Sequence, residues 1–166
     1  MDRVSYKPLK EEIGTEEIFD LVFKDPTVKY GLQEFSSKGI LERVNTFEKE
    51  DGRFYARCLK RDKDIFIYDK NKKRGKPEEV IRQLWLVKLT QEYKYPLDRI
   101  EVEKSVQFGR EVRTKSADIV LYKEDKITPY IIFELKQPNA KKAEEQLKSY
   151  LSAEGAGRVD DGTVKK

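Results

Sequence analysis

Histidine is absent from the 166 residues, and this absence excludes several classes of site. Serine–histidine hydrolases, histidine-ligated metal centres and nucleases with a histidine base all require that side chain. The single cysteine, Cys58, excludes an internal disulfide and a cysteine zinc site, and its alternating apolar surroundings indicate a buried thiol. No apolar run approaches the ~18 residues of a membrane span, and there is no glycine-rich phosphate loop. We therefore expect a cytoplasmic protein with no membrane segment and no ATP site of the familiar kind.

The composition is that of one ordinary domain, or of a small domain with an appendage. Charged residues make up 40% of the chain and hydrophobic residues 37%, so the surface is strongly solvated. The 35 Lys and Arg against 31 Asp and Glu leave a net charge of +4. This mild excess permits nucleic-acid binding without arguing for it.

Residues 1–75 are predicted to form a small helical and β-hairpin region. Thr15 is expected to cap a short helix that reaches Phe23, and a second helix is expected to run from Asp25 to Gly39. From Arg53 the apolar period changes to two, which predicts a hairpin.

A basic loop, residues 70–76, follows this hairpin and contains Lys72, Lys73 and Arg74. Such a loop is either a solvated turn or a contact for DNA phosphates. We therefore carry its three consecutive cations forward as candidate DNA contacts.

Residues 76–157 show a helix, three strands and a second helix. The expected ranges are 77–93 for the first helix, 100–108, 117–122 and 130–136 for the strands, and 140–152 for the second helix. Residues 158–166 are mostly charged and are expected to be a disordered tail.

Charged residues occur in the last two predicted strands, where burial should disfavour them. Asp118 opens one apolar run, and Glu134 and Lys136 end the next, two residues apart and hence on one face of a strand. Two carboxylates with a lysine are costly to bury unless a cation compensates for the lost hydration. Oxygen ligands suit Mg²⁺, with Mn²⁺ as an alternative, and a lysine would assist phosphodiester hydrolysis. The alternative is a structural ion pair between Glu134 and Lys136 on an edge strand.

This arrangement resembles the PD-(D/E)xK nuclease family. The resemblance implies that Asp118 is the first metal ligand, Glu134 the second and Lys136 the catalytic lysine, although Ala117 stands where the family pattern has proline. Gln146 and Tyr150 look like the Gln-x-x-x-Tyr element of RecB-like members.

Glu79 resembles the further acid that many members supply from the first core helix. Its alternative role is that of an ordinary first-turn acid favoured by the helix dipole. The main-chain carbonyl of Leu135 would complete the metal ligands.

A closer resemblance covers roughly residues 53–157 and is to the N-terminal nuclease domain of type I restriction R subunits, a domain also found fused to adenine DNA methylases. It rests on segments such as Lys76 to Gln83, Tyr95-Pro96 and Ala117 to Val120. It implies an α/β (α+β) fold with a restriction-endonuclease-like core and a mixed sheet. It also implies a Mg²⁺-dependent DNA endonuclease that works with methylase and specificity subunits. The expected DNA contacts are Lys72, Lys73, Arg74, Arg113 and Lys115.

The family's closing apolar strand has no counterpart here, because residues 157–166 are polar and rich in glycine. We therefore expect the chain to stop inside the fold. A non-catalytic DNA-binding or assembly module attached to a methylase or translocase is the alternative function. A nuclease that acts on RNA is a third, since a metal site does not read the sugar.

Overall fold

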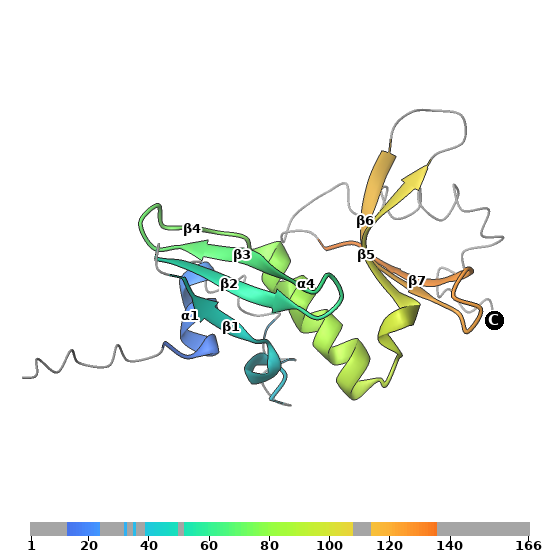
Figure 1. Cartoon of the computed structure of the whole chain (residues 1–166), viewed down its shortest axis with the longest axis horizontal. Coiled ribbons are helices and arrows are strands. Elements are labelled where there is room, and N and C mark those ends of the chain that lie inside the picture. The colour runs from blue at the N-terminus through green and yellow to red at the C-terminus, as the bar shows by residue number, and fades with distance from the viewer. Residues whose placement is uncertain are drawn as a thin grey trace, which may run out of the picture.

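The computed structural model describes residues 13–23, 32, 35, 39–49, 52–107 and 114–135. Its central element is helix α4 (Pro77–Val87), which lies between a four-stranded sheet and a three-stranded sheet (Figure 1). All strand pairings in the described ranges are antiparallel. The chain is therefore an α+β protein, as the sequence predicts.

The four-stranded sheet comes from the N-terminal half, in the order β1-β2-β3-β4. Its strands are β1 (Thr46–Glu48), β2 (Arg53–Cys58), β3 (Lys63–Asp69) and β4 (Arg74–Gly75). The β2–β3 pair is the hairpin predicted from the period of two. The strands β1 and β4 were not predicted, because two or three residues are too few to show a period.

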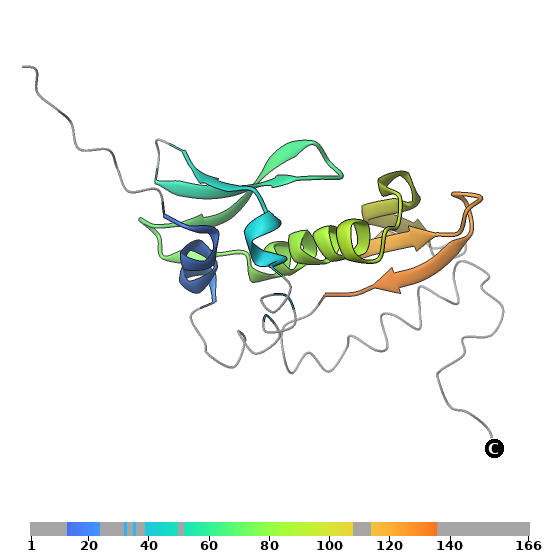
Figure 2. The ribbon, with the colours of Figure 1, turned by 90° about the horizontal axis from the view of Figure 1, so that it is seen from below.

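Helix α1 (Thr15–Val22) lies on the same side of this sheet as α4 (Figure 2). The predicted helix is confirmed, but the prediction that Thr15 caps it is wrong, because Gly14 holds the N-cap position. The Thr15 hydroxyl lies instead 2.7 Å from the hydroxyl of Thr46 on β1. It therefore ties the helix to the sheet. Of the predicted helix 25–39, Leu32, Phe35 and Gly39 are the residues that the structure describes, and the rest of it lies outside the described ranges.

Helix α4 begins at Pro77, which has no N–H group to leave unpaired. It continues as the π-helical turn η3 (Lys88–Glu92), so the predicted end near Tyr93 is confirmed. The Thr90 hydroxyl donates to the carbonyl of Leu86 at 2.7 Å, an interaction that competes with regular helix bonding. A 3-10 turn, η4 (Leu97–Arg99), then leads into the second sheet.

The second sheet has the order β5-β6-β7 and is built from the three predicted strands. They are β5 (Ile100–Gln107), β6 (Thr114–Tyr122) and β7 (Pro129–Phe133). The expected mixed sheet would need a parallel pair, and none occurs among the described strands. The reason is that six-residue links, 108–113 and 123–128, can join only antiparallel neighbours.

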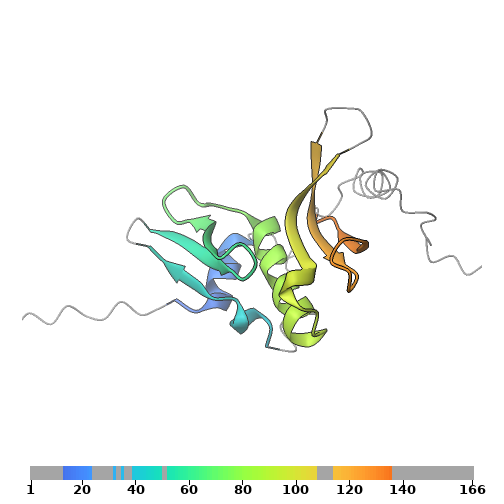
Figure 3. The ribbon, with the colours of Figure 1, turned by 45° about the vertical axis from the view of Figure 1, so that its right-hand side comes forward.

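Two apolar clusters meet along α4, which lies between the sheets in Figure 3. The first cluster packs α1, β2 and β3 against Val80, Leu84 and Val87. The second packs Leu86 and Leu89 against β5 and β6. The two faces of α4 thus serve different sheets. No helix in the described ranges is long and apolar enough to cross a bilayer.

The candidate functional site

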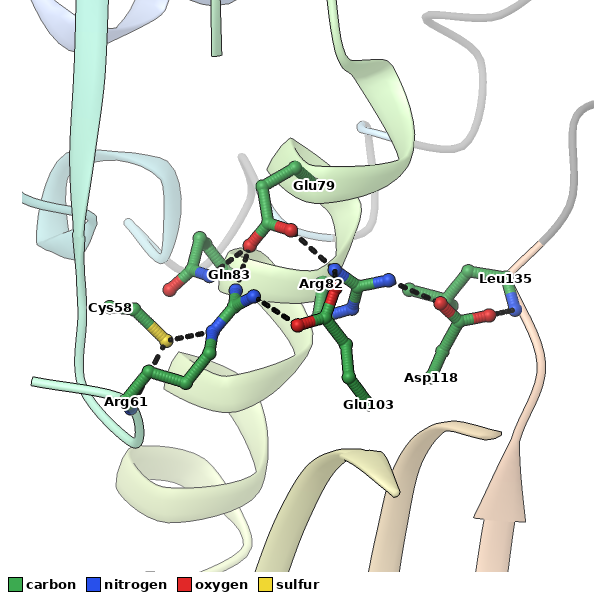
Figure 4. A network of polar contacts seen from close by, with 8 residues as sticks. All are labelled: Cys58, Arg61, Glu79, Arg82, Gln83, Glu103, Asp118 and Leu135. Carbon is green, nitrogen blue, oxygen red and sulfur yellow. Dashed lines mark hydrogen bonds and ion pairs between the residues drawn. The ribbon is translucent and has the colours of Figure 1, made fainter. Parts of the chain in front are cut away.

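A network of charged side chains occupies the space between α4 and the two sheets (Figure 4). Two arginines form its centre: Arg82 on α4, and Arg61 in the turn between β2 and β3. Their partners are three carboxylates, contributed by Glu79 on α4, Glu103 on β5 and Asp118 on β6. The network therefore joins every layer of the fold.

Glu79 lies in the first turn of α4, and its side chain is only 7% exposed. One carboxylate oxygen accepts hydrogen bonds from Arg61 and from the amide of Gln83, the latter at 2.6 Å. The other oxygen accepts from Arg82, one helical turn further along. Glu79 is thus a buried, fully engaged member of the network rather than a solvated first-turn acid.

Asp118 bridges α4 and the segment that follows β7. Its Oδ1 accepts from Arg82, and its Oδ2 accepts the backbone N–H of Leu135 at 2.7 Å. The ladder between β6 and β7 ends at the pair Ile119 and Phe133, so the predicted strand 130–136 is shorter than expected. Just beyond this end of the ladder, the backbone of Leu135 is therefore held beside the Asp118 side chain, so these two candidate ligand residues are neighbours.

Glu103 lies opposite Asp118, between two regular backbone pairs that join β5 to β6. Its φ of +51° is in the left-handed region, which a glutamate adopts at a cost of about 1–3 kcal/mol. Its carboxylate accepts from Arg61 at 2.9 Å and from Arg82 at 3.4 Å. The irregular backbone therefore occurs where a third acid meets the two arginines.

The electrostatics of the network keep both guanidinium groups charged. Burial by itself would lower the pKa of Arg82, but the charges of Glu79, Asp118 and Glu103 outweigh it and raise that pKa. Burial would also lower the pKa of Arg61, but its hydrogen bond with Cys58, followed by the charges of Glu79, Cys58 and Glu103, raises it overall. Burial would raise the pKa of the Cys58 thiol, yet hydrogen bonds from Arg61, one of them at 3.3 Å, lower it overall.

A pocket of about 330 Å³ opens beside the network. The first turn of α4 forms one wall, and Arg82 and Glu103 form part of the remainder. The Nε of Arg82 is buried and has no hydrogen-bond partner in the part of the chain that the structure describes. The carboxylates are held by the other guanidinium nitrogens, Nη1 and Nη2.

The predicted site residues fall into two groups. Glu79, Asp118, Glu134 and Leu135 are described, and the structure gathers them around Arg82 or in the segment bonded to Asp118. The others, Lys136, Gln146, Tyr150 and Arg113, lie outside the described residues, as does the side chain of Lys115. Within the described ranges, no three His, Cys, Asp or Glu side chains come together as a metal cluster.

Of the predicted DNA contacts, the three in the basic loop are described. Lys72 and Lys73 are exposed in the turn between β3 and β4, and Arg74 is exposed in β4 itself. The carboxylate of Asp69 accepts the N–H groups of Asn71 and Lys72, both at 2.9 Å, and so shapes this turn. The loop is thus an ordered, exposed turn.

Arg61, Arg82 and Glu103 were missed by reasoning from the sequence. The only signal for Arg82 is its spacing of three from Glu79, which is common on solvated helix surfaces. Arg61 and Glu103 contact each other although they lie 42 positions apart in the sequence, and no local pattern marks such a pair.

Comparison with known proteins finds a match to one family model. No curated protein and no solved structure matches the chain. Residues 77–157 match the family described as the type I restriction enzyme R protein N terminus, HSDR_N. The match begins at the first residue of α4 and includes Glu79, Arg82, Glu103, Asp118 and Leu135. Residues 77–157, slightly less than half of the chain, are thus similar to the N-terminal domains of type I restriction enzyme R proteins, and this similarity supports a role in a restriction system.

Proposed function

We propose that the chain is the DNA endonuclease domain of a type I restriction system, which hydrolyses phosphodiester bonds with Mg²⁺. The observation that carries this proposal is the bond between Asp118 and the backbone of Leu135. It joins the acid of β6 to the segment Glu134-Leu135-Lys136, and the family match supports the same assignment.

The chemistry of the donor set fits Mg²⁺. This ion prefers oxygen ligands and is usually held by one or two protein carboxylates, with water and substrate phosphate completing its shell. Asp118 and Glu134 would supply those carboxylates, together with a main-chain carbonyl such as that of Leu135. When bound, Mg²⁺ would neutralise phosphate charge and activate the attacking water. Mn²⁺, with the same preference for oxygen, would be an alternative.

The remaining roles fall to residues of the chain itself. We assign to Lys136 the orientation or deprotonation of the attacking water and the stabilisation of charge on the phosphate. Gln146 and Tyr150 would support the site or contact DNA, and Lys72, Lys73, Arg74, Arg113 and Lys115 would contact phosphates. Methylase and specificity subunits of a larger restriction complex are the proposed partners.

Glu79 has a different part in this proposal. It was a candidate fourth metal ligand, but both of its oxygens are engaged by arginine and glutamine. We therefore assign it to holding Arg82 and Arg61 in place beside Asp118.

A second candidate function has support from Arg82. Its guanidinium binds Asp118 directly, so in this arrangement a cation already compensates the acid that a metal would need. A non-catalytic DNA-binding or assembly module would keep this ion pair permanently.

Two variants separate these functions. The endonuclease proposal predicts that the chain nicks supercoiled plasmid when Mg²⁺ is added, and that Asp118→Asn and Lys136→Ala each abolish nicking. Calorimetry should show Mg²⁺ binding by the unchanged chain and none by Asp118→Asn. Circular dichroism provides the control that both variants fold. Full nicking by either folded variant would contradict the assignment, and DNA binding without any cutting would favour the second function.

A further inference from the structure

The N-terminal sheet has a face that the nuclease proposal does not use. Helices α1 and α4 lie on one side of this sheet in Figure 2, and no described element lies over the other side. Residues of β2 alternate accordingly: Phe54, Ala56 and Cys58 are buried, whereas Tyr55 and Arg57 are not. The family match begins at residue 77, so this face lies outside it.

A row of three aromatic side chains crosses this face. Phe47 on β1, Tyr55 on β2 and Phe66 on β3 are successive cross-strand partners. The rings of Phe47 and Tyr55 stack with centroids 6.2 Å apart, and those of Tyr55 and Phe66 meet edge to face at 6.0 Å. All three residues are partly exposed. Each strand thus contributes one ring to a continuous strip.

Cations surround this aromatic row. The Lys49 ammonium lies 4.2 Å from the ring centroid of Tyr55, and the Lys76 ammonium lies 6.0 Å from that of Phe66. Arg57, two residues after Tyr55, projects from the same face of β2. Asp64 accepts from both Lys49 and Arg57, at 3.2 and 3.1 Å, which holds these cations beside the rings.

The basic loop adjoins one end of the row. The N–H of Lys70 donates to the carbonyl of Gly52, so the turn after β3 packs against the turn between β1 and β2. Residues 46–76 contain eleven Lys and Arg against six Asp and Glu, a net charge of +5, whereas the whole chain has +4. The positive charge of the protein is therefore concentrated on this sheet and its turns.

We propose that this aromatic and basic face binds single-stranded DNA. Bases stack on exposed aromatic rings without regard to sequence, while neighbouring cations contact the phosphates. A duplex keeps the faces of its bases stacked inside, so an aromatic row favours a single strand. We propose DNA rather than RNA as the ligand because residues 77–157 match a restriction enzyme family. This inference concerns other residues than the proposed metal site and stands without it.

The test is fluorescence anisotropy with labelled oligothymidylate of about 16 nucleotides, the upper end of a typical site. The full chain is used in EDTA, so that neither metal binding nor cleavage affects the result. The unchanged chain should bind this strand more tightly than a duplex or an oligouridylate of the same length. Tyr55→Phe keeps the ring and should bind like the unchanged chain. Tyr55→Leu should weaken binding on the order of tenfold, because one stacking surface is lost.

The charge contribution is tested separately, with variants of exposed residues. Lys49→Gln combined with Arg57→Gln should lower the slope of log Kd against log salt by about 1.4, because two phosphate contacts are lost. The matched control is Lys123→Gln with Lys126→Gln, which removes the same charge from the turn between β6 and β7 and should leave binding unchanged.

Three results would overturn the proposal. The first is that folded Tyr55→Leu and Tyr55→Phe bind oligothymidylate with equal affinity. The second is that the Lys49 and Arg57 double variant and the Lys123 and Lys126 double variant weaken oligothymidylate binding equally. The third is binding of duplex or oligouridylate that is as tight as binding of oligothymidylate. Failure of plasmid nicking would leave these measurements unaffected.

Discussion

Arg82 is the residue on which two candidate metal ligands converge. It binds Asp118 and Glu79 at once, and its own side chain is only 9% exposed. A buried ion pair is not strong evidence for stability, but removal of one partner leaves an uncompensated buried charge. The role of Arg82 is therefore best measured by its removal.

We predict that Arg82→Met destabilises the chain on the order of 3 kcal/mol, because Glu79 and Asp118 lose their common partner. Urea unfolding followed by the fluorescence of Trp85, the only tryptophan in the sequence, measures this loss. If Asp118 binds Mg²⁺, added Mg²⁺ should stabilise Arg82→Met more than the unchanged chain, because the competing guanidinium is gone. Arg82→Lys, which retains the charge, is the control. An equal response of all three chains to Mg²⁺ would contradict a metal site at Asp118.

The candidate site was predictable from the sequence only in part. Acids at the ends of apolar runs are conspicuous, because burial of a charge is costly, and this signal marked Asp118 and Glu134. Arg82 and Glu103 gave no such signal. An arginine three residues after a glutamate is ordinary on a helix, and the left-handed backbone of Glu103 has no local sequence cause.

At the scale of elements, the turn between β6 and β7 shows how one side chain can determine a connection. Asp125 accepts the N–H groups of Ile127 and Thr128 at 2.9 and 2.8 Å, and the Thr128 hydroxyl at 2.5 Å. These hydrogen bonds, that of the Thr128 hydroxyl above all, lower the pKa of Asp125 to about 2. This turn joins β6, which carries Asp118, to β7, which leads to the Leu135 backbone that Asp118 binds.

The sign of the resulting pH dependence follows from that pKa. A carboxyl whose pKa is lower in the folded chain stabilises it above the unfolded pKa of 3.8, and this contribution is lost as pH falls towards 2. We predict that the amides of Ile127 and Thr128 lose protection from hydrogen exchange across this range. In Asp125→Asn their protection should not change with pH there. Unchanged protection of the two amides in the native chain between pH 4 and 2 would contradict this role.

The long elements were predictable because their apolar patterns are long enough to show a period. Helix α4, the β2–β3 hairpin and the three strands of the second sheet all follow such patterns. The short strands β1 and β4 depend on neighbours distant in sequence, and so does the end of β7. Beyond the end of β7, the N–H group of Leu135 donates to the Asp118 side chain rather than to the backbone of β6.

At the scale of the whole molecule, α4 is shared between two cores. The sequence predicts an N-terminal appendage of residues 1–75 and a nuclease core that starts at residue 76, and this boundary remains a prediction. The first apolar cluster crosses it, however, because Val80 and Leu84 pack with residues of α1 and β2. Arg61 crosses it as well, through its bonds to Glu79 and Glu103.

We therefore predict that a chain beginning at residue 76 does not fold by itself. One face of α4 would be exposed, and both Glu79 and Glu103 would lose Arg61. Thermal unfolding followed by circular dichroism should show no cooperative transition for this fragment. A chain beginning at Ile13 keeps every described contact and should unfold cooperatively, like the full chain. A sharp transition in the residue-76 fragment would show instead that the predicted core folds independently and that the N-terminal sheet is an appendage. The contact between Arg61 and Glu79 would then be an interface between two domains.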